Sequence, residues 1–173
     1  PKSKGIGNSQ VLPKDYKIKS QIELVLSEMA EQVAIRLRRV KKKAKSVHIH
    51  ISYSKIESKK SINASKKINP TQSTKQLTDH VLSLFRSKYD GGAVRSIAVR
   101  YDNLIDDNLT IYTLFDDIEA IEKQRKIDKT LDTIRDKYGF LSVQNGSMLM
   151  EGSRVKERSK LVGGHTGGMD GII

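Results

Sequence analysis

Three groups of side chains in this sequence are of types that could do chemistry. A His-x-His doublet could ligate zinc, two Asp-Asp pairs could hold metal ions for phosphoryl chemistry, and a dense run of Lys and Arg could bind a polyanion. These groups are, in order, His48 and His50; Asp106, Asp107, Asp116 and Asp117; and the twelve Lys or Arg residues from Arg36 to Lys67.

The sequence disfavours metal binding by the doublet and by the acidic pairs. His48 and His50 fall on one side of an alternating segment, but no third ligand is placed beside them, so contact with phosphates is favoured over a metal site. The acidic pairs lie in a linker and at the start of a helix, where carboxylates cap free N–H groups. Because no Ser-His-Asp order, Walker loop or dinucleotide fingerprint is present, we predict no catalytic residue, no metal and no cofactor in this chain.

The positive charge is confined to one part of the chain. Residues 1–67 hold 17 Lys or Arg and 5 Asp or Glu, whereas residues 68–173 hold 15 of each, and the net charge is +12. Such a one-sided field attracts a polyanion, and nucleic acid is the leading partner. A solvated, solubilising face is the alternative.

The elements that must position these groups follow from the hydrophobic spacing. Apolar residues at steps of three and four predict one helix over residues 18–43, whose last turns carry Arg and Lys. Strict alternation in SVHIHISYS (46–54) predicts a half-buried strand, and a loop at 55–60 leads to a weaker strand over 62–68.

The order of elements predicts an α+β fold. A capping box of Ser73 and Gln76 starts a second helix, YDGG at 89–92 ends it, the run from Ala93 alternates again, and residues 5–13 fit an edge strand. The βαββαβ order predicts a four-stranded antiparallel or mixed sheet with both helices on one face. The other face would be open and would carry His48, His50, Asn63, Lys67, Ser96 and Arg100.

Composition changes after residue 105. We predict a DNA-binding domain over 1–105, an acidic linker over 106–117, and a third helix with a loosely structured tail over 118–173, the tail beginning at Gly146. The chain has no cysteine and no apolar run long enough for a membrane span, which is typical of a soluble cytoplasmic protein.

Several blocks in a fixed order resemble one family. They are KGIGNSQVLPKDY, EMAEQVAIRLR, VHIHISYS, INPTQSTKQL, VRSIAVRYDNL, LDTIRDKYGF and ERSKLVGGHTGG. Together they resemble the C-terminal part of Y-family translesion DNA polymerases, most of all the UmuC/ImpB/MucB type and the UvrX-like UV-damage repair proteins of Gram-positive bacteria. The likeness runs through nearly all 173 residues.

The resemblance implies a role in gripping DNA. In that family this region is the little finger, which lays its open sheet against the primer-template duplex, while the carboxylates that bind the catalytic Mg²⁺ belong to a palm domain nearer the N-terminus. A chain that begins at Pro1 holds no counterpart of the palm, so we expect part of a larger enzyme that makes no DNA by itself. The predicted DNA contacts are Arg36, Arg38, Arg39, Lys41, Lys42, Lys43, Lys45, His48, His50, Lys66, Lys67 and Arg100.

The family also carries a short clamp-binding peptide of the form Gln-Leu-x-Leu-Phe after the last strand. Set on this sequence, Leu114 and Phe115 fit, whereas Ile111 replaces the Gln and Tyr112 the Leu. We therefore predict that the sliding clamp is a second partner, the alternative being an added edge strand or a lid over the third helix. Other functions left open are a stand-alone RNA-binding protein and a pure protein-interaction module.

Overall fold

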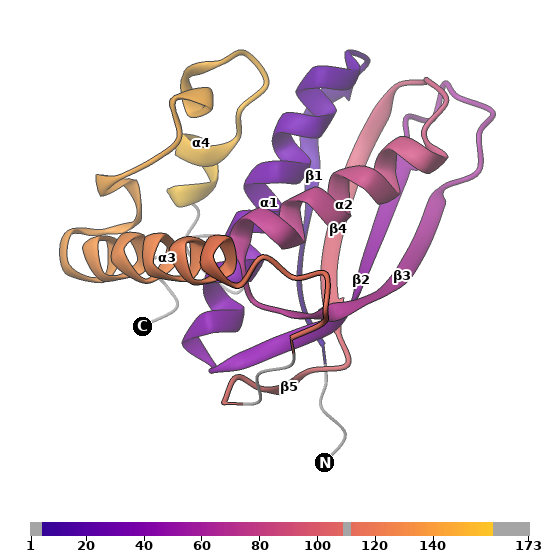
Figure 1. Ribbon diagram of the computed structural model, residues 1–173. Helices are drawn as coiled ribbons and strands as arrows, with labels where there is room; N and C mark the ends of the chain where they lie inside the picture. The colour runs from indigo at the N-terminus through magenta and orange to yellow at the C-terminus, as the bar shows by residue number, and fades with distance from the viewer. Residues whose placement is uncertain (1–4, 109–111, 161–173) are drawn as a thin grey trace. The chain divides into compact units, whose positions relative to one another are not determined.

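Four long strands and two helices form the first part of the protein in the computed structural model, which describes residues 5–108 and 112–160. The elements are β1 (Ile6–Tyr16), α1 (Lys19–Arg39), β2 (Lys42–Tyr53), β3 (Ile62–Thr71), α2 (Thr74–Lys88) and β4 (Val94–Asp102). The strands are antiparallel in the order β1-β4-β2-β3, and both helices lie on one face of the sheet (Figure 1). The predicted α+β fold is confirmed.

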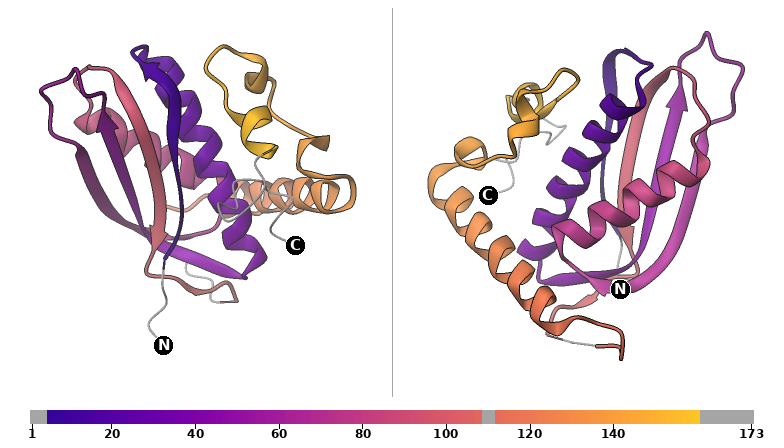
Figure 2. Two further views of the ribbon diagram at one scale, coloured as in Figure 1. Left: turned by 180° about the vertical axis from the view of Figure 1, so that it is seen from behind. Right: turned by 45° about the horizontal axis from the view of Figure 1, so that its top comes forward.

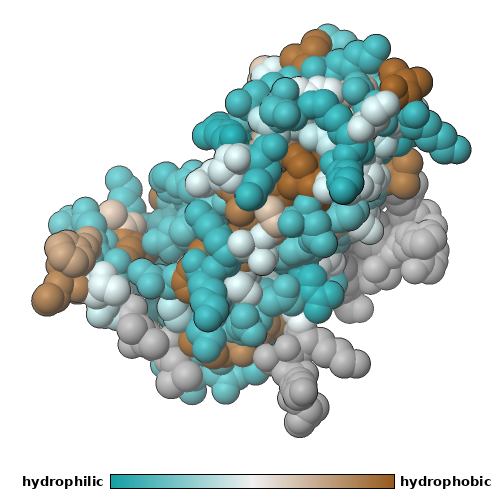
Figure 3. Space-filling view, turned by 90° about the vertical axis from the view of Figure 1, so that its right-hand side faces the viewer, coloured by the Kyte–Doolittle hydropathy of each residue, from teal (hydrophilic) through white to brown (hydrophobic). Residues whose placement is uncertain are grey.

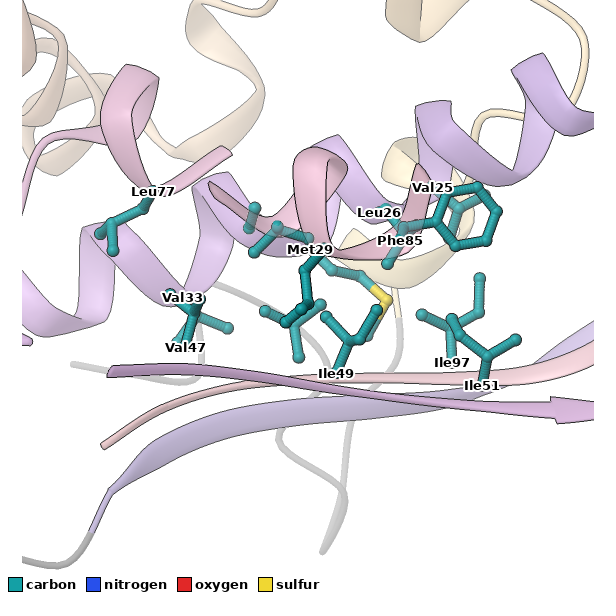
Figure 4. Packing of buried hydrophobic residues seen from close by; sticks show 14 of the residues in the cluster. Val25, Leu26, Met29, Val33, Val47, Ile49, Ile51, Leu77, Phe85 and Ile97 are labelled. Atoms are coloured by element: carbon teal, nitrogen blue, oxygen red, sulfur yellow. The ribbon is translucent and has the colours of Figure 1, made fainter. Parts of the chain in front are cut away.

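The core lies between the sheet and its two helices. Every second residue of β2 points to the helices, so Val47, Ile49 and Ile51 are fully buried there. They meet Val25, Leu26, Met29 and Val33 of α1, Leu77 and Phe85 of α2, and Ile97 of β4 (Figure 4). Burial of each such side chain contributes about 1.5–3 kcal/mol. Because this core covers one face of the sheet, only the opposite face of each strand can contact a partner.

Helix α1 ends four residues earlier than the sequence predicts. It stops at Arg39, and Lys41 adopts a left-handed conformation with φ 55°. Lys42 and Lys43 then pair with the short strand β5 (Ile105–Asp106). Pairing in the sheet therefore outweighs the helical spacing at this point, and Lys41, Lys42 and Lys43 are in or beside a strand.

The edge strand is longer than predicted but lies where it was expected. β1 pairs only with β4, and its register shifts between Val11 and Tyr16. Pro13 falls within this irregular stretch, which suits a residue that donates no backbone hydrogen bond. β3 forms the other edge.

The start of α2 shows half of the predicted capping box. The Ser73 side chain accepts a hydrogen bond from the backbone N–H of Gln76. The Gln76 side chain instead accepts from the hydroxyl of Thr71 at 2.5 Å. The predicted N-cap at Ser73 is therefore confirmed. The Gln76 side chain does not complete the capping box but joins the first turn of α2 to the end of β3.

Asp106 and Asp107, placed in a linker by the sequence, are held against the sheet. Asp106 forms an ion pair with Lys42. The backbone N–H of Asp107 donates to the carbonyl oxygen of Lys41, and its side chain accepts from Gln72. These contacts reduce the positive charge at the start of β2.

Residues 112–173 form a second unit, distinct from residues 1–111. Its described part contains α3 (Ile118–Tyr138), short 3-10 helices at Phe140–Ser142 and Gly146–Leu149, and α4 (Val155–Ser159). Residues 146–160 are therefore more structured than the predicted loose tail, while residues 161–173 lie outside the described residues.

The ends of α3 agree with the expected caps. The Asp117 side chain accepts from the N–H of Ala120, and Gly139 follows the helix with φ 96°, a conformation that favours glycine. None of the described helices combines the length and the apolar character needed to cross a bilayer.

Candidate nucleic-acid interface

The face of the sheet opposite the helices is hereafter the open face. No helix of the described first unit covers it, as Figure 2 (left) shows from behind. The strand register places Gly7, Arg100, His48 and Ser65 side by side in one row across the four strands. A neighbouring row holds Ser9, Ala98, His50 and Asn63, and Lys67 lies opposite Ser46.

Four of the predicted DNA contacts share this face. They are His48, His50, Lys67 and Arg100, because they alternate with the buried residues of their strands. His48 Nε2 is hydrogen-bonded to Asn63 Oδ1, and His50 Nε2 lies 3.1 Å from Ser52 Oγ. The first bond joins β2 to β3 and the second lies within β2, and together they orient the two imidazoles.

Arg36 and Arg38 of α1, a helix on the other side of the sheet, donate to backbone carbonyl oxygens. Arg36 Nη1 donates to the carbonyl oxygen of Gly7, and burial lowers the pKa of Arg36. Arg38 Nη1 donates to the carbonyl oxygen of Gln72 and to Thr74 Oγ1, joining the end of α1 to the start of α2. Arg39 belongs to the same last turn and is half-buried. The open face and these three arginines are therefore not brought together.

Lys66 also lies apart from the open face. It pairs in register with buried Val47, whereas Lys67 pairs with Ser46. The positive charge of Lys66 helps burial to lower the pKa of His80 in α2, which places Lys66 near the helices. Consecutive residues of a strand face opposite sides, so of this pair only Lys67 projects from the open face.

The lysines at the start of β2 form a basic end of the first unit. Lys41 and Lys45 are exposed, Lys42 and Lys43 are half-buried, and Lys42 is paired with Asp106. The ammonium groups of exposed lysines lie in solvent, where phosphates can reach them. Lys41 and Lys45 therefore extend the set of available cations beyond Lys67 and Arg100.

Sequence reasoning missed Asp102 and the role of two glycines. Asp102 lies two residues beyond Arg100 on the open face, and its Oδ1 accepts a 2.6 Å hydrogen bond from Arg100 Nε. Continuing the alternation of β4 by two residues would have found it. Gly5 and Gly7 lie against Arg100, a neighbourhood that only the sheet register reveals.

The surrounding surface is polar. Seen from the side that carries the β2–β3 hairpin, the molecule is mostly hydrophilic with separate small hydrophobic patches (Figure 3). The members of the open face that the register defines include no Phe, Tyr or Trp. Within the described ranges no three His, Asp or Glu side chains cluster so as to hold a metal ion. The arrangement offers hydrogen-bond donors and positive charge to an anion.

The apolar segment of the second unit forms a turn that displays two side chains. The backbone N–H of Thr113 donates to Asp116 Oδ2, and the N–H of Asp116 donates to the carbonyl oxygen of Thr113. Leu114 and Phe115, between these residues, are 100% and 96% exposed. A hydrogen bond from the Tyr112 hydroxyl to Glu122 raises the pKa of Tyr112. Ile111 lies outside the described residues.

Comparison with known proteins confirms the family resemblance. A family model, the impB/mucB/samB family C-terminal domain, matches residues 3–114, and the chain belongs to this family. DNA polymerase IV 2 of Halalkalibacterium halodurans is 30% identical over 165 residues, which cover 95% of this chain and 40% of that protein. The putative UV-damage repair protein UvrX of Bacillus subtilis is 35% identical over 160 residues, which cover 92% of this chain and 38% of that protein.

The chain spans about two fifths of the length of these curated relatives. Among solved structures, a chain of a complex of the beta-clamp processivity factor and the little finger domain of PolIV aligns with a TM-score of 0.48 and 13% identity. That alignment covers 65% of this chain and 98% of the other.

Proposed function

We propose that this chain grips duplex DNA through the open face and acts as the DNA-holding C-terminal part of a translesion polymerase. The observation that carries the proposal is a sheet face that no described helix of the first unit covers and that displays Lys67, Arg100, His48 and His50 (Figure 2). The relatives of the chain include DNA polymerase IV 2 and UvrX. DNA synthesis, and the Mg²⁺ it requires, would belong to a palm domain rather than to residues 1–173. The bacterial cytoplasm, with its nucleoid DNA, is the proposed place of action.

The chemistry of the face favours phosphates over bases. Lysine, arginine and imidazole N–H groups donate to phosphate oxygens, and such contacts position a duplex without reading its sequence. An RNA-binding sheet of the RRM type stacks bases on aromatic rings, and the described open face has no Phe, Tyr or Trp for this. Binding should therefore be largely independent of base sequence.

Salt dependence tests the DNA proposal. With about four to six phosphate contacts, log K against log salt should have a slope of roughly −3.5 to −5.5. Fluorescence anisotropy of a labelled primer-template duplex measures this slope over a range of salt concentrations. A slope near zero, or a strong preference for one base sequence, would contradict the proposal.

Single charge removals locate the interface. Lys67→Gln and Arg100→Gln should each reduce the magnitude of the slope by about one without changing sequence preference. Lys88→Gln is the matched control, because Lys88 is exposed in the last turn of α2, on the other side of the sheet. It should leave the slope nearly unchanged. If Lys88→Gln acts as strongly as Arg100→Gln, the open face is not the contact surface.

A second proposed function is binding of the bacterial sliding clamp through the turn at residues 113–116. What supports it is the full exposure of Leu114 and Phe115, two neighbouring apolar side chains. Exposed apolar groups of this kind mark binding sites. The carboxylate of Asp116 holds the turn, so the two anchors are presented together before a partner arrives.

Truncation of the anchors tests the clamp proposal by titration calorimetry. Leu114→Ala/Phe115→Ala should weaken clamp binding by about 2 kcal/mol or more while leaving the thermal unfolding curve unchanged. Leu149→Ala/Met150→Ala is the control, since both residues are exposed apolar side chains of the same unit. Ile111→Gln should tighten binding several-fold by restoring the usual polar residue. The clamp proposal is wrong if the intact chain does not bind, or if the anchor variant binds equally well.

A further inference from the structure

The side chain of Arg100 lies along the backbone of β1, at a place where β1 has no side chains. A Cβ atom built on Gly5 would lie 2.8 Å from Arg100 Nε and 1.9 Å from Asp102 Oδ1. A Cβ on Gly7 would lie 3.1 Å from Arg100 Cβ and 3.3 Å from its Cγ. The two glycines therefore leave the space that the arginine and its acidic neighbour occupy.

Asp102 engages one side of the guanidinium only. Arg100 Nε donates to Asp102 Oδ1 at 2.6 Å, and the Arg100 side chain remains 52% exposed against 31% for Asp102. No hydrogen bond from Arg100 Nη1 or Nη2 is found within the described structure, so these two nitrogens can donate elsewhere. A guanidinium offers donors in a rigid planar fork, so holding Nε fixes the direction of the remaining pair.

We propose that Gly5, Gly7 and Asp102 are positioning residues that hold Arg100 as a fixed, two-pronged contact for one phosphodiester group of bound DNA. The proposal rests on the DNA-gripping function proposed above and names the chemistry of one contact in it. His48 lies directly opposite Arg100 on β2, but its Nε2–H already donates to Asn63 Oδ1, so Arg100 supplies the donors to this phosphate. Bidentate arginine contacts to phosphate oxygens are stronger and more directional than those of a lysine.

Removal of the Asp102 carboxylate distinguishes two explanations, because a pure charge effect and a positioning role predict opposite changes in duplex affinity. A carboxylate on a phosphate-binding face repels DNA, so if charge alone mattered, Asp102→Asn would tighten duplex binding. If Asp102 orients Arg100, the same substitution releases the guanidinium and weakens binding. The amide of Asn offers a weaker acceptor and no charge to hold it.

The experiment is a duplex titration of the intact chain and its variants at fixed salt. Asp102→Asn and Gly7→Ala should each weaken binding by about threefold to tenfold, and Arg100→Gln by about tenfold or more. Arg100→Lys should bind more weakly than the unaltered chain and more tightly than Arg100→Gln, because lysine keeps the charge but lacks the fork. In the Arg100→Gln background, Asp102→Asn should have no further weakening effect.

The control carries the same change of charge on the helix side. Asp79→Asn removes an exposed acid that is paired with Lys75 on α2, and it should leave duplex binding equal or slightly tighter. The inference is overturned if Asp102→Asn tightens binding as Asp79→Asn does, if its effect adds fully to that of Arg100→Gln, or if Arg100→Lys binds like the unaltered chain.

Failure of the inference and failure of the proposed function look different. If the unaltered chain binds no duplex, the DNA-gripping proposal fails. If it binds with the expected salt slope but Asp102→Asn does not weaken it, only the positioning role fails. Far-UV circular dichroism melts test whether each variant is folded. A Gly5→Ala variant would press on the backbone carbonyl of Tyr101 and is the one most at risk of not folding. Asp102→Asn tests the positioning role without it.

Discussion

Removing the hydroxyl group of Tyr101 should destabilise the first unit at neutral pH and stabilise it, relative to the unaltered chain, at high pH. Tyr101 is fully buried, and its hydroxyl donates a 2.8 Å hydrogen bond to the carbonyl oxygen of Ala30 in α1. Burial raises the pKa of Tyr101 well above its ordinary value, because a buried phenolate would lose its hydration. The residue joins the strand that bears Arg100 to the helix layer.

The expected changes in unfolding free energy follow from the loss of one hydrogen bond and from the ionisation of one phenol group. At neutral pH, Tyr101→Phe should cost about 1 kcal/mol of unfolding free energy. Because the folded pKa lies above the unfolded one, the stability from Tyr101 is fully present below about pH 10 and is lost as pH rises. The loss approaches about 1.4 kcal/mol per pH unit, so the two stability curves should cross between about pH 10.5 and 11.

Urea unfolding followed by far-UV circular dichroism measures both arms of this prediction, since the chain has no tryptophan to report by fluorescence. Tyr138→Phe is the control, because Tyr138 is 67% exposed and lies in the second unit. A stability difference between the unaltered chain and Tyr101→Phe that stays constant from about pH 8 to pH 11 would refute the reasoning.

Three other substitutions probe single groups. Gln10 is 8% exposed and its amide finds no hydrogen-bond partner in the described part of the chain, so Gln10→Leu should raise the unfolding free energy in urea by about 1 kcal/mol; a decrease would contradict this. Arg86 lowers the pKa of Glu23 through hydrogen bonds to both carboxylate oxygens. Since the folded pKa lies below the unfolded one, that stabilisation is present above about pH 4.5 and is lost on acidification, so the unaltered chain should lose more stability than Glu23→Gln between about pH 5 and pH 3; parallel acid curves would argue against it. Ser73→Ala removes the cap of Gln76 N–H and should cost about 1 kcal/mol in a thermal melt, with an unchanged melt as the contrary result.

Much of the fold could be predicted from local patterns. Strict alternation of apolar and polar residues around His48 is incompatible with a helix. The same alternation predicted which residues of β2 are buried. Ser73 and Asp117 identify helix starts because their side chains accept backbone N–H bonds locally. Gly139 marks a helix end because its φ of 96° favours glycine. Such signals depend on residues close in the chain, so no tertiary contact is needed to interpret them.

The candidate interface was only partly predictable, because a count of cations does not say which way each one points. Arg36 and Arg38 belong to the densest basic stretch, yet both donate to backbone carbonyl oxygens, of Gly7 in β1 and of Gln72 before α2. Lys66 and Lys67 are identical in type and adjacent in the chain, and the pleat sends them to opposite faces. Charge composition predicts a polyanion as the kind of partner, whereas the register determines which cations face the side of the sheet proposed to bind it.

The sequence by itself determined the alternation of strands and helices, the two helix caps, the basic excess of the first 67 residues and the family. Only the tertiary structure decided that Asp102 and Gly7 are neighbours of Arg100 and that Lys42 is neutralised by Asp106. The physical reason is distance along the chain: β1 and β4 are separated by more than seventy residues, and their pairing is fixed by burial of the whole core rather than by any residue near the site.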